Sequence, residues 1–295
     1  MKNKKIVNVG DLIDNVAKDF ELAKLCYGHG TDNAWDEAYF LLAGAAKMLD
    51  LELEKFCSMS LNDFPVNKDQ LRQILDKRVI ERQPVAYIIG YTYFADLLFK
   101  VDTKVLIPRS PFGELIMKRF QPWVNLEKLQ RVLDLCTGCG CMAIATAKYL
   151  PNLTVDAIDI SLDALNLAEK NKKINKVKVD FWQSDLFKKV SNKYDLIISN
   201  PPYVGEEEIK DLPMEYLHEP GLALLGGKRG DEMLIDIIEN SARYLSDGGQ
   251  LIVEVGNSLP LIEKYFKIPF IQLTFEQGMS EVLLFEKIDL EKIFR

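Results

Sequence analysis

The sequence predicts an α/β catalytic domain preceded by a small helical domain, and three observations predict it. Before residue 90, apolar residues recur at helical spacing, and one such stripe is Ala38, Leu41, Leu42, Ala45 and Met48. From residue 131 onward, short apolar runs alternate with helical patterns, as strands and helices do in an α/β sheet. Several of these runs are followed at once by an acid or an Asn, and open α/β sheets bind ligands at the carboxyl ends of their strands.

The chain is expected to divide near residue 90. Residues 1–90 form the helical domain, in which residues 31–33 (Thr-Asp-Asn) can cap a helix. Residues 91–109 are expected to form a β-hairpin linker, because most of this stretch alternates as strands do. Residues 110–295 form the catalytic domain, whose first helix is expected to start at Ser110.

The catalytic domain is expected to continue as alternating strands and helices. Its last two strands are close together in sequence, so they should pair antiparallel. The expected elements are a strand, tight loop and helix over 131–145, strands at 154–159, 177–182 and 194–199, helices at 231–245 and 259–266, and strands at 250–255, 270–275 and 281–285.

Composition excludes several classes of protein. The 295 residues are 48% hydrophobic, enough for a sizeable core, yet no run of 18 or more apolar residues occurs and no apolar leader follows the basic residues 2–5. We therefore expect a cytoplasmic protein without a membrane partner. The net charge of −7 argues against sequence-specific nucleic-acid binding, which needs clustered Lys and Arg, and favours a basic partner.

The cysteines indicate a reducing compartment. There are five, an odd number, and three of them are Cys136, Cys139 and Cys141. A zinc site is the alternative reading of this run, but no fourth ligand accompanies it, so no metal is expected.

The tetrapeptide Asn200–Tyr203 (Asn-Pro-Pro-Tyr) follows the predicted strand 194–199 directly. Neither Pro201 nor Pro202 has an N–H, so the loop is stiff and cannot extend a ladder. The Asn200 carboxamide and the Asn200 and Pro201 carbonyls supply acceptors, and Tyr203 supplies a flat wall. An amide or aromatic amine fits such a pocket, although an Asn-Pro pair alone can simply end a strand.

The turn in residues 131–145 contains Gly138 and Gly140, which allow a ligand to approach the backbone in front of a helix N-terminus. The pattern does not match the dinucleotide fingerprint G-x-G-x-x-G, since Cys136 occupies the first glycine position. Asp134 at the strand end would also repel phosphate. A zwitterionic or cationic ligand is therefore expected.

Two further strand ends carry acids. Asp159 ends the strand 154–159, at the place from which a carboxylate can accept both hydroxyls of a ribose, and Ser161 caps the next helix. Asp185, after the strand 177–182, could accept from an adenine amino group, with Leu186 or Phe187 packed on the ring.

Residues 131–203 resemble a class I S-adenosylmethionine-dependent methyltransferase, whose fold is a Rossmann-like, mostly parallel seven-stranded sheet. The Asn200–Tyr203 motif resembles that of amino and amide methyltransferases. The resemblance implies the cofactor S-adenosyl-L-methionine, with S-adenosyl-L-homocysteine as product. It implies cofactor contacts at Asp134, Thr137, Gly138, Cys139, Gly140, Asp159, Ile160, Asp185, Leu186 and Asn200. Cys139 stands where such enzymes usually have Ser or Thr.

Segments 82–94 and 105–116 resemble the protein-glutamine methyltransferases. Release-factor enzymes of that family usually carry Asp-Thr-Glu after the Pro-Arg pair, whereas Ser110-Pro111 resembles the branch that modifies large-subunit ribosomal protein L-3. Segments 27–37, 211–220 and 254–258 extend the similarity over nearly the whole chain. The implied partner is basic ribosomal protein L-3, free or in a ribosome assembly intermediate. A release-factor methyltransferase, a DNA adenine methyltransferase and a non-catalytic assembly factor remain alternatives.

The resemblance implies that Asn200, Pro201, Pro202 and Tyr203 are catalytic, and that Asn200, Pro201, Tyr203, Glu219 and Pro220 contact substrate. An alkylated amide sheds its proton readily, so no strong base is required, and neither histidine, His29 or His218, is expected to act as one. The Asn200 side-chain oxygen and the Pro201 carbonyl would accept the two amide N–H bonds and orient the nitrogen.

Overall fold

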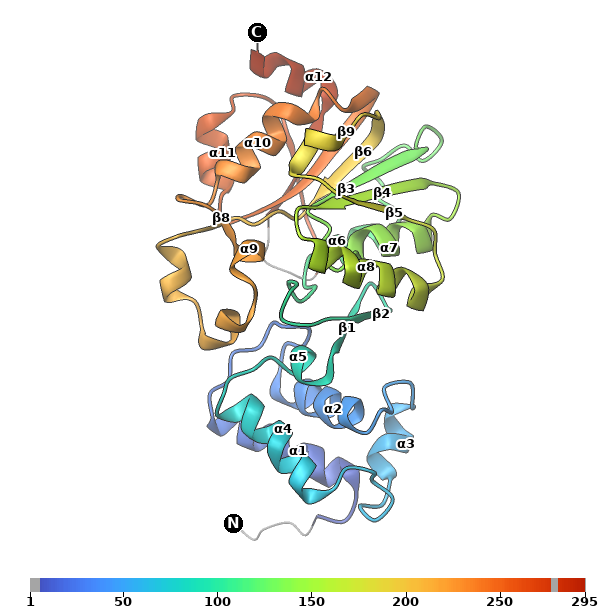
Figure 1. Ribbon diagram of the computed structural model, residues 1–295, viewed down its shortest axis with the longest axis vertical. Helices are drawn as coiled ribbons and strands as arrows, with labels where there is room; N and C mark the ends of the chain where they lie inside the picture. The colour runs from blue at the N-terminus through green and yellow to red at the C-terminus, as the bar shows by residue number, and fades with distance from the viewer. Residues whose placement is uncertain (1–5, 277–280, 295) are drawn as a thin grey trace. The chain divides into compact units, whose positions relative to one another are not determined.

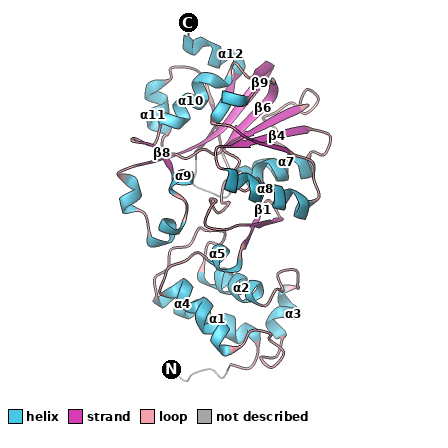
Figure 2. Cartoon of the chain, viewed as in Figure 1, coloured by secondary structure: helices cyan, strands magenta, loops and turns pink. Residues whose placement is uncertain are grey.

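The computed structural model describes residues 6–276 and 281–294. The chain forms two compact units, drawn in Figures 1 and 2. One comprises Met1–Thr92 together with Pro213–His218, and the other comprises Tyr93–Leu212 and Glu219–Arg295. The predicted division near residue 90 placed residues 213–218 with the catalytic part, whereas their contacts are with the helical unit.

The helical unit is built around one apolar core, to which Ile13, Phe20, Leu41 and Phe56 contribute fully buried side chains. Its helices are α1 (Val9–Leu22), α2 (Ala34–Ala45), α3 (Leu53–Ser58), α4 (Lys68–Val79) and α5 (Val85–Ile89), and the 3₁₀ helix η3 (Met214–His218) joins them. Helices α1, α2 and α4 each begin after an Asn whose side chain accepts a backbone N–H of the first turn. For α2 that cap is Asn33, within the predicted stretch.

The predicted hairpin forms from β1 (Tyr91–Phe94) and β2 (Leu97–Lys100), which pair in a two-stranded sheet. Its two-residue turn, Ala95-Asp96, has positive φ at both positions, 48° and 57°. That turn matches the twist of the flanking strands, although neither residue is glycine.

The second unit contains a seven-stranded sheet in the order β10-β11-β9-β6-β3-β4-β5. Five neighbouring strands run parallel, whereas β11 pairs antiparallel with both β9 and β10. This confirms the predicted fold class, including the antiparallel pair at the end of the chain. The strands are β3 (Arg131–Leu135), β4 (Thr154–Asp159), β5 (Asp180–Gln183), β6 (Tyr194–Ser199), β9 (Leu245–Gly256), β10 (Ile271–Leu273) and β11 (Glu281–Glu286).

Helices cover both faces of this sheet (Figure 1). Alternate strand residues point to opposite faces: in β6, Leu196 and Ile198 join one apolar cluster and Ile197 joins the other. The first cluster is closed by α6 (Phe112–Met117) and α7 (Cys141–Tyr149), beside which α8 (Leu162–Asn175) packs. The second is closed by α10 (Glu232–Ser241), α11 (Leu259–Tyr265) and α12 (Lys287–Leu290).

Short elements complete the unit. They are the 3₁₀ helices η1 (Leu186–Lys189), η2 (Glu208–Asp211) and η4 (Glu291–Phe294), the helix α9 (Gly221–Leu224), and the strands β7 (Val204–Gly205) and β8 (Leu225–Gly227), which pair with each other. In the part of the chain that the structure describes, no helix is both long and apolar enough to cross a membrane.

Candidate active site

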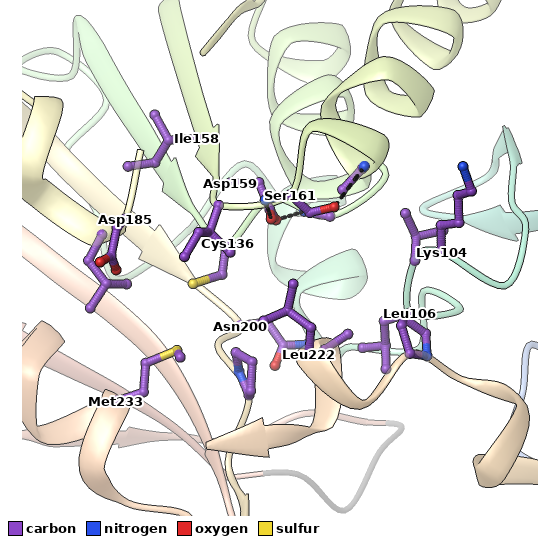
Figure 3. A pocket seen from close by; sticks show the side chains of 18 of the residues that line it. Lys104, Leu106, Cys136, Ile158, Asp159, Ser161, Asp185, Asn200, Leu222 and Met233 are labelled. Atoms are coloured by element: carbon purple, nitrogen blue, oxygen red, sulfur yellow. Dashed lines mark hydrogen bonds between the residues drawn. The ribbon is translucent and has the colours of Figure 1, made fainter. Parts of the chain in front are cut away.

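A pocket opens at the carboxyl ends of the parallel strands, where the sheet topology places it (Figure 3). The loops after β3, β4, β5 and β6 all contribute to its wall, as do segments 104–106 and 220–223 and the start of α10. Its lining residues include Cys136, Gly138, Asp159, Ile160, Asp185, Leu186, Asn200, Pro202, Pro220, Leu222 and Met233.

The glycine loop between β3 and α7 folds as the sequence predicts. Gly138 and Gly140 have φ values of 56° and 82°, in the left-handed region. A Cβ on Gly140 would lie 2.9 Å from the Ala168 Cβ of α8, so this glycine permits close packing of the two helices. A Cβ on Gly138 would meet nothing within 4 Å. The Gly138 backbone therefore faces open space in which a ligand can lie.

Asp134 lies beneath this loop rather than in the pocket wall, and it is fully buried. One of its oxygens accepts from the Thr137 hydroxyl at 2.5 Å and from the Ala143 N–H at 3.1 Å. Its Oδ1 has no hydrogen-bond partner among the described residues. Burial raises the pKa of Asp134 to about 7. Asp134 therefore braces the loop that faces the ligand space.

Asp159 lines the pocket and links two of its loops. Its Oδ2 accepts the Gly138 N–H and its Oδ1 accepts the Ser161 N–H, both at 2.8 Å. Ser161 in turn caps α8, accepting the Ala164 N–H as predicted. Burial raises the pKa of Asp159, against the opposing effect of these backbone bonds. The Ile160 N–H is a third backbone donor to this carboxylate, and its two oxygens together still have room to accept from a ribose hydroxyl.

The loop after β5 carries the third acid. Asp185 lines the pocket and pairs with Lys188 at 2.5 Å on the exposed side. Leu186, with a φ of 42°, also lines the pocket. Phe187 does not, because it is 5% exposed and its ring stacks on Tyr244 at a centroid distance of 4.5 Å. Of the two candidates for packing on a ligand ring, Leu186 fits and Phe187 is a core residue.

The stiff loop after β6 brings Asn200 and Pro202 into the pocket wall, whereas Pro201 and Tyr203, predicted to act on the substrate, do not line it. The preceding Ser199 donates its hydroxyl to the Leu135 carbonyl at 2.9 Å, which ties the end of β6 to the end of β3. The Tyr203 hydroxyl donates to Glu254 Oε1 at 3.1 Å. The motif is thus anchored to both neighbouring strands, β3 and β9.

Glu219 and Pro220, predicted to contact substrate, lie in different surroundings. Pro220 lines the pocket. The Glu219 side chain is buried and forms a two-pronged pair with Arg109, at 2.6 and 2.7 Å, and its Oε1 also accepts the Ile107 N–H at 3.0 Å. Such bidentate geometry fixes the segment that leads into the pocket.

The structure brings most of the predicted cofactor residues together. Gly138, Asp159, Ile160, Asp185, Leu186 and Asn200 line the pocket, whereas Asp134, Thr137, Cys139 and Gly140 lie behind it. Sequence reasoning missed Cys136, Leu222 and Met233 as lining residues. Cys136 stands in the glycine turn and could have been found there, but apolar residues such as Leu222 and Met233 look like core in a sequence.

The polar and apolar groups that line the pocket distinguish among ligands. Two carboxylates, an open glycine backbone and apolar walls suit a nucleoside that carries positive charge, and they disfavour a pyrophosphate. Lys104, which also lines the pocket, is paired with Asp163 at 2.9 Å. Adenosylmethionine has a ribose, an adenine ring, a sulfonium and an ammonium, so the residues present fit it.

The three cysteines of the run, Cys136, Cys139 and Cys141, are not in disulfides. Burial raises the pKa of the Cys136 thiol well above its usual range, so it stays protonated. Within residues 6–276 and 281–294, no three His, Cys, Asp or Glu side chains group as metal ligands. Neither described histidine lines the pocket: His29 packs against Tyr216 and His218 Nε2 lies 2.8 Å from the Glu81 carbonyl, all within the helical unit.

Known proteins share both the sequence and the fold. The methyltransferase small domain family matches residues 114–276. The ribosomal protein uL3 glutamine methyltransferase of Xanthomonas campestris is 38% identical over 94% of this chain and 90% of its own length. The Neisseria meningitidis protein of the same name is 36% identical over 97% of this chain and 95% of its own.

A solved structure shares the fold alone. The hMettl16 catalytic domain, in complex with MAT2A 3′UTR hairpin 6, superposes with a TM-score of 0.53 at 16% identity, covering 83% of this chain and 91% of that one. The identity and coverage of the curated relatives, together with the glycine loop and the Asn200–Tyr203 motif at the sheet edge, decide the family. The chain belongs to the ribosomal protein uL3 glutamine methyltransferases, a family of methyltransferase enzymes.

Proposed function

We propose that this chain transfers a methyl group from S-adenosyl-L-methionine to the side-chain amide nitrogen of a glutamine in ribosomal protein uL3, the protein called L-3 above. The observation that carries the proposal is that one pocket is lined both by Gly138 and Asp159 and by Asn200 and Pro202. A cofactor subsite at the first pair would then adjoin an amide acceptor subsite at Asn200. Family membership supports the reaction, and the names of the curated relatives support the acceptor.

The cofactor would be held by groups from three strand ends. Asp159 would accept from the ribose hydroxyls, Asp185 from the adenine amino group, and Leu186 and Ile160 would pack on the ring. The Gly138 backbone would lie against the amino-acid moiety. When bound, S-adenosyl-L-methionine supplies an electrophilic methyl group on a sulfonium.

Positioning is the main contribution of the protein to the reaction. An amide nitrogen is a weak nucleophile because its lone pair is delocalised into the carbonyl. The Asn200 side-chain oxygen and the Pro201 carbonyl would accept the two amide N–H bonds and hold the nitrogen in line with the methyl group. These acceptor dipoles favour the positive charge that grows on nitrogen, and Tyr203 would stack on the amide plane. One amide proton then leaves to water, so no histidine is needed.

The surface beside the pocket suits a basic partner. Glu206, Glu207 and Glu208 follow Tyr203 closely and are exposed. A cluster of like charges attracts an oppositely charged protein and accelerates its encounter. The helical unit, residues 1–90 in the predicted division, is proposed to recognise the rest of the ribosomal protein or of an assembly intermediate.

The test is methyl transfer from labelled S-adenosyl-L-methionine to purified uL3, with release factors and duplex DNA as competing acceptors and mass spectrometry of the labelled peptide. Label on a glutamine of uL3 is the expected result. Label only on a release factor would keep the chemistry and overturn the acceptor, and label only on DNA would overturn both.

The role of Asn200 has its own prediction. Asn200→Ala should lower kcat by about 100-fold or more, because both orientation and an acceptor are lost, while the Kd for S-adenosyl-L-methionine changes little. The matched control is Asn152→Ala, an exposed Asn just before β4 at the opposite edge of the sheet. Turnover in Asn200→Ala equal to that of the control would remove Asn200 from the mechanism.

A further inference from the structure

Glu254, on strand β9 between β11 and β6, is buried at 2% exposure beside the Asn200–Tyr203 loop. Its Oε1 accepts from the Tyr203 hydroxyl at 3.1 Å, and its Oε2 accepts from the Ser110 hydroxyl. Ser110 in turn accepts the Phe112 N–H, the first of helix α6, at 3.1 Å. A hydrogen-bonded chain therefore runs from the start of α6 through Glu254 to Tyr203.

The ring of Tyr203 is held from a second side by the end of β9. A Cβ built on Gly256 would lie between 2.4 and 2.9 Å from the Tyr203 atoms Cε2, Cδ2 and Cζ. The ring therefore packs directly on the Gly256 backbone. With its hydroxyl bonded to Glu254 and its edge against Gly256, the aromatic plane has a defined orientation.

Stability alone does not explain a carboxylate at this place. Burying an ionised carboxylate costs free energy that hydrogen bonds only offset, and apolar replacements of buried ionic groups are often neutral or stabilising. Position 254 lies in the interior of the sheet, between Val253 and Val255, both fully buried. A carboxylate here does what an apolar residue cannot: it fixes two hydroxyls from different segments.

We propose that Glu254 is a positioning residue of the methyl transfer, which orients the Tyr203 ring toward the acceptor amide, and that Ser110 holds the Glu254 carboxylate in place. The inference rests on the proposed function, since it assigns Tyr203 to the acceptor subsite. Glu254 itself acts through Tyr203.

A double-mutant cycle on kcat tests the coupling, with Glu254→Ala, Tyr203→Phe and the double variant. Each single variant breaks the same hydrogen bond, so each should lower kcat by about 10-fold or more, and the double variant should be no slower than the worse single one. Glu254→Gln keeps an oxygen that can accept from Tyr203, so it should retain kcat within about threefold of the wild type. The Kd for S-adenosyl-L-methionine should stay unchanged throughout.

Ser110→Ala should lower kcat in the same direction but less, because Tyr203 keeps its acceptor. Its matched control is Ser246→Ala, which removes another hydroxyl bonded to a carboxylate, that of Asp195, at the far end of β9. The control should leave kcat unchanged. If Glu254→Ala does not fold, Glu254→Gln, Ser110→Ala and Tyr203→Phe still give the order of effects.

The assignment would be overturned if the double variant lost as much kcat as the product of the two single losses. It would also be overturned if Glu254→Ala left kcat unchanged. A loss in Glu254→Gln as large as that in Glu254→Ala would overturn it too, since the charge and not the Tyr203 bond would then matter. The cycle is measured on whichever acceptor the wild-type chain labels. A wrong acceptor therefore overturns the proposed function, whereas additivity overturns the role of Glu254.

Discussion

At the scale of single residues, Gly256 is a position where a small change should have a large effect on the site. Gly256→Ala adds a methyl group that would overlap the Tyr203 ring, and it also strains a backbone with a φ of 50°. The ring must move, so kcat should fall by about 10-fold or more.

Gly248→Ala is the matched control for this change. Gly248 lies on the same strand, its φ is 74°, and an added Cβ there would meet nothing within 4 Å. In both variants an alanine must adopt a left-handed backbone conformation, which costs about 1–2 kcal/mol. Thermal unfolding should therefore report a similar loss of stability from this backbone strain. Only Gly256→Ala should lose activity. Equal kcat in the two variants would show that the position of the Tyr203 ring does not matter.

Asp134 should make the free energy of unfolding of the protein depend on pH. Because burial raises the pKa of Asp134 to about 7, the native state favours the protonated acid, while the unfolded chain ionises near its ordinary value of 3.8. The native state therefore binds more protons between these values, and the free energy of unfolding falls as pH rises through this window. The full effect is on the order of 4 kcal/mol.

Urea unfolding of the cofactor-free protein from pH 4 to 8 measures this effect. Asp134→Asn removes the titration while keeping an oxygen for Thr137 and Ala143, so its stability should fall less steeply with pH than that of the wild type. The raised pKa of Asp159 acts in the same direction in both proteins, and the difference isolates Asp134. Parallel curves would contradict the burial argument.

At the scale of elements, the sequence predicts best where a strand is set by local pattern. The strands β4 (Thr154–Asp159) and β6 (Tyr194–Ser199) have the predicted bounds, because each is an apolar run that a polar loop ends. The third strand was predicted from residue 177 but starts at Asp180, since pairing with β4 begins only at Asp156. Its start is set by a neighbour and not by its own residues.

The region from 231 to 256 shows the same limit. The helix predicted to end at residue 245 ends at Ser241, and the strand predicted from residue 250 begins at Leu245. Leu245 pairs with Tyr194 at the start of β6, and the register shifts before the ladder resumes at Gln250. The glycines at 248 and 249, which indicate a turn, therefore form an irregularity inside one long strand. Tertiary pairing overrides the local turn signal.

At the scale of the whole molecule, the chain crosses between its two units at Thr92, at Leu212 and again after His218. The sequence does not predict the second and third crossings, because they depend on buried contacts between residues far apart in the chain. Glu215 Oε1 accepts from Arg78 at 3.2 Å, across 137 positions, and from the Cys26 N–H at 2.9 Å. Nothing in the sequence around a single Glu or a single Arg indicates that the two side chains will form an ion pair.

Arg78 is the centre of this cluster and is fully buried. Besides Glu215, it donates to Glu37 at 3.0 Å and to the Cys26 carbonyl at 2.8 Å. Arg78→Ala would leave the buried Glu37 without its cation and Glu215 with only Arg82, whose Nη1 lies 3.7 Å from Oε1, which should cost about 3–5 kcal/mol of stability in urea unfolding. Arg72→Ala, on the same helix α4, removes an exposed arginine whose Nε lies 3.8 Å from Asp76, and it should cost less than about 0.5 kcal/mol.

The stability lost in Arg78→Ala should also be concentrated in residues 213–218. A defect in the apolar core would instead weaken the whole helical unit. Residues 213–218 follow the Tyr203 loop after nine intervening residues and belong to the helical unit through Glu215. Without Arg78 this segment keeps only weaker contacts such as that of His218 with the Glu81 carbonyl, so trypsin should cleave after Lys210 faster than in the wild type, under native conditions. Arg72→Ala should leave that rate unchanged. Faster cleavage throughout the helical unit, with Lys210 no more sensitive than other sites, would mean that Arg78 stabilises the unit in general and does not hold the segment.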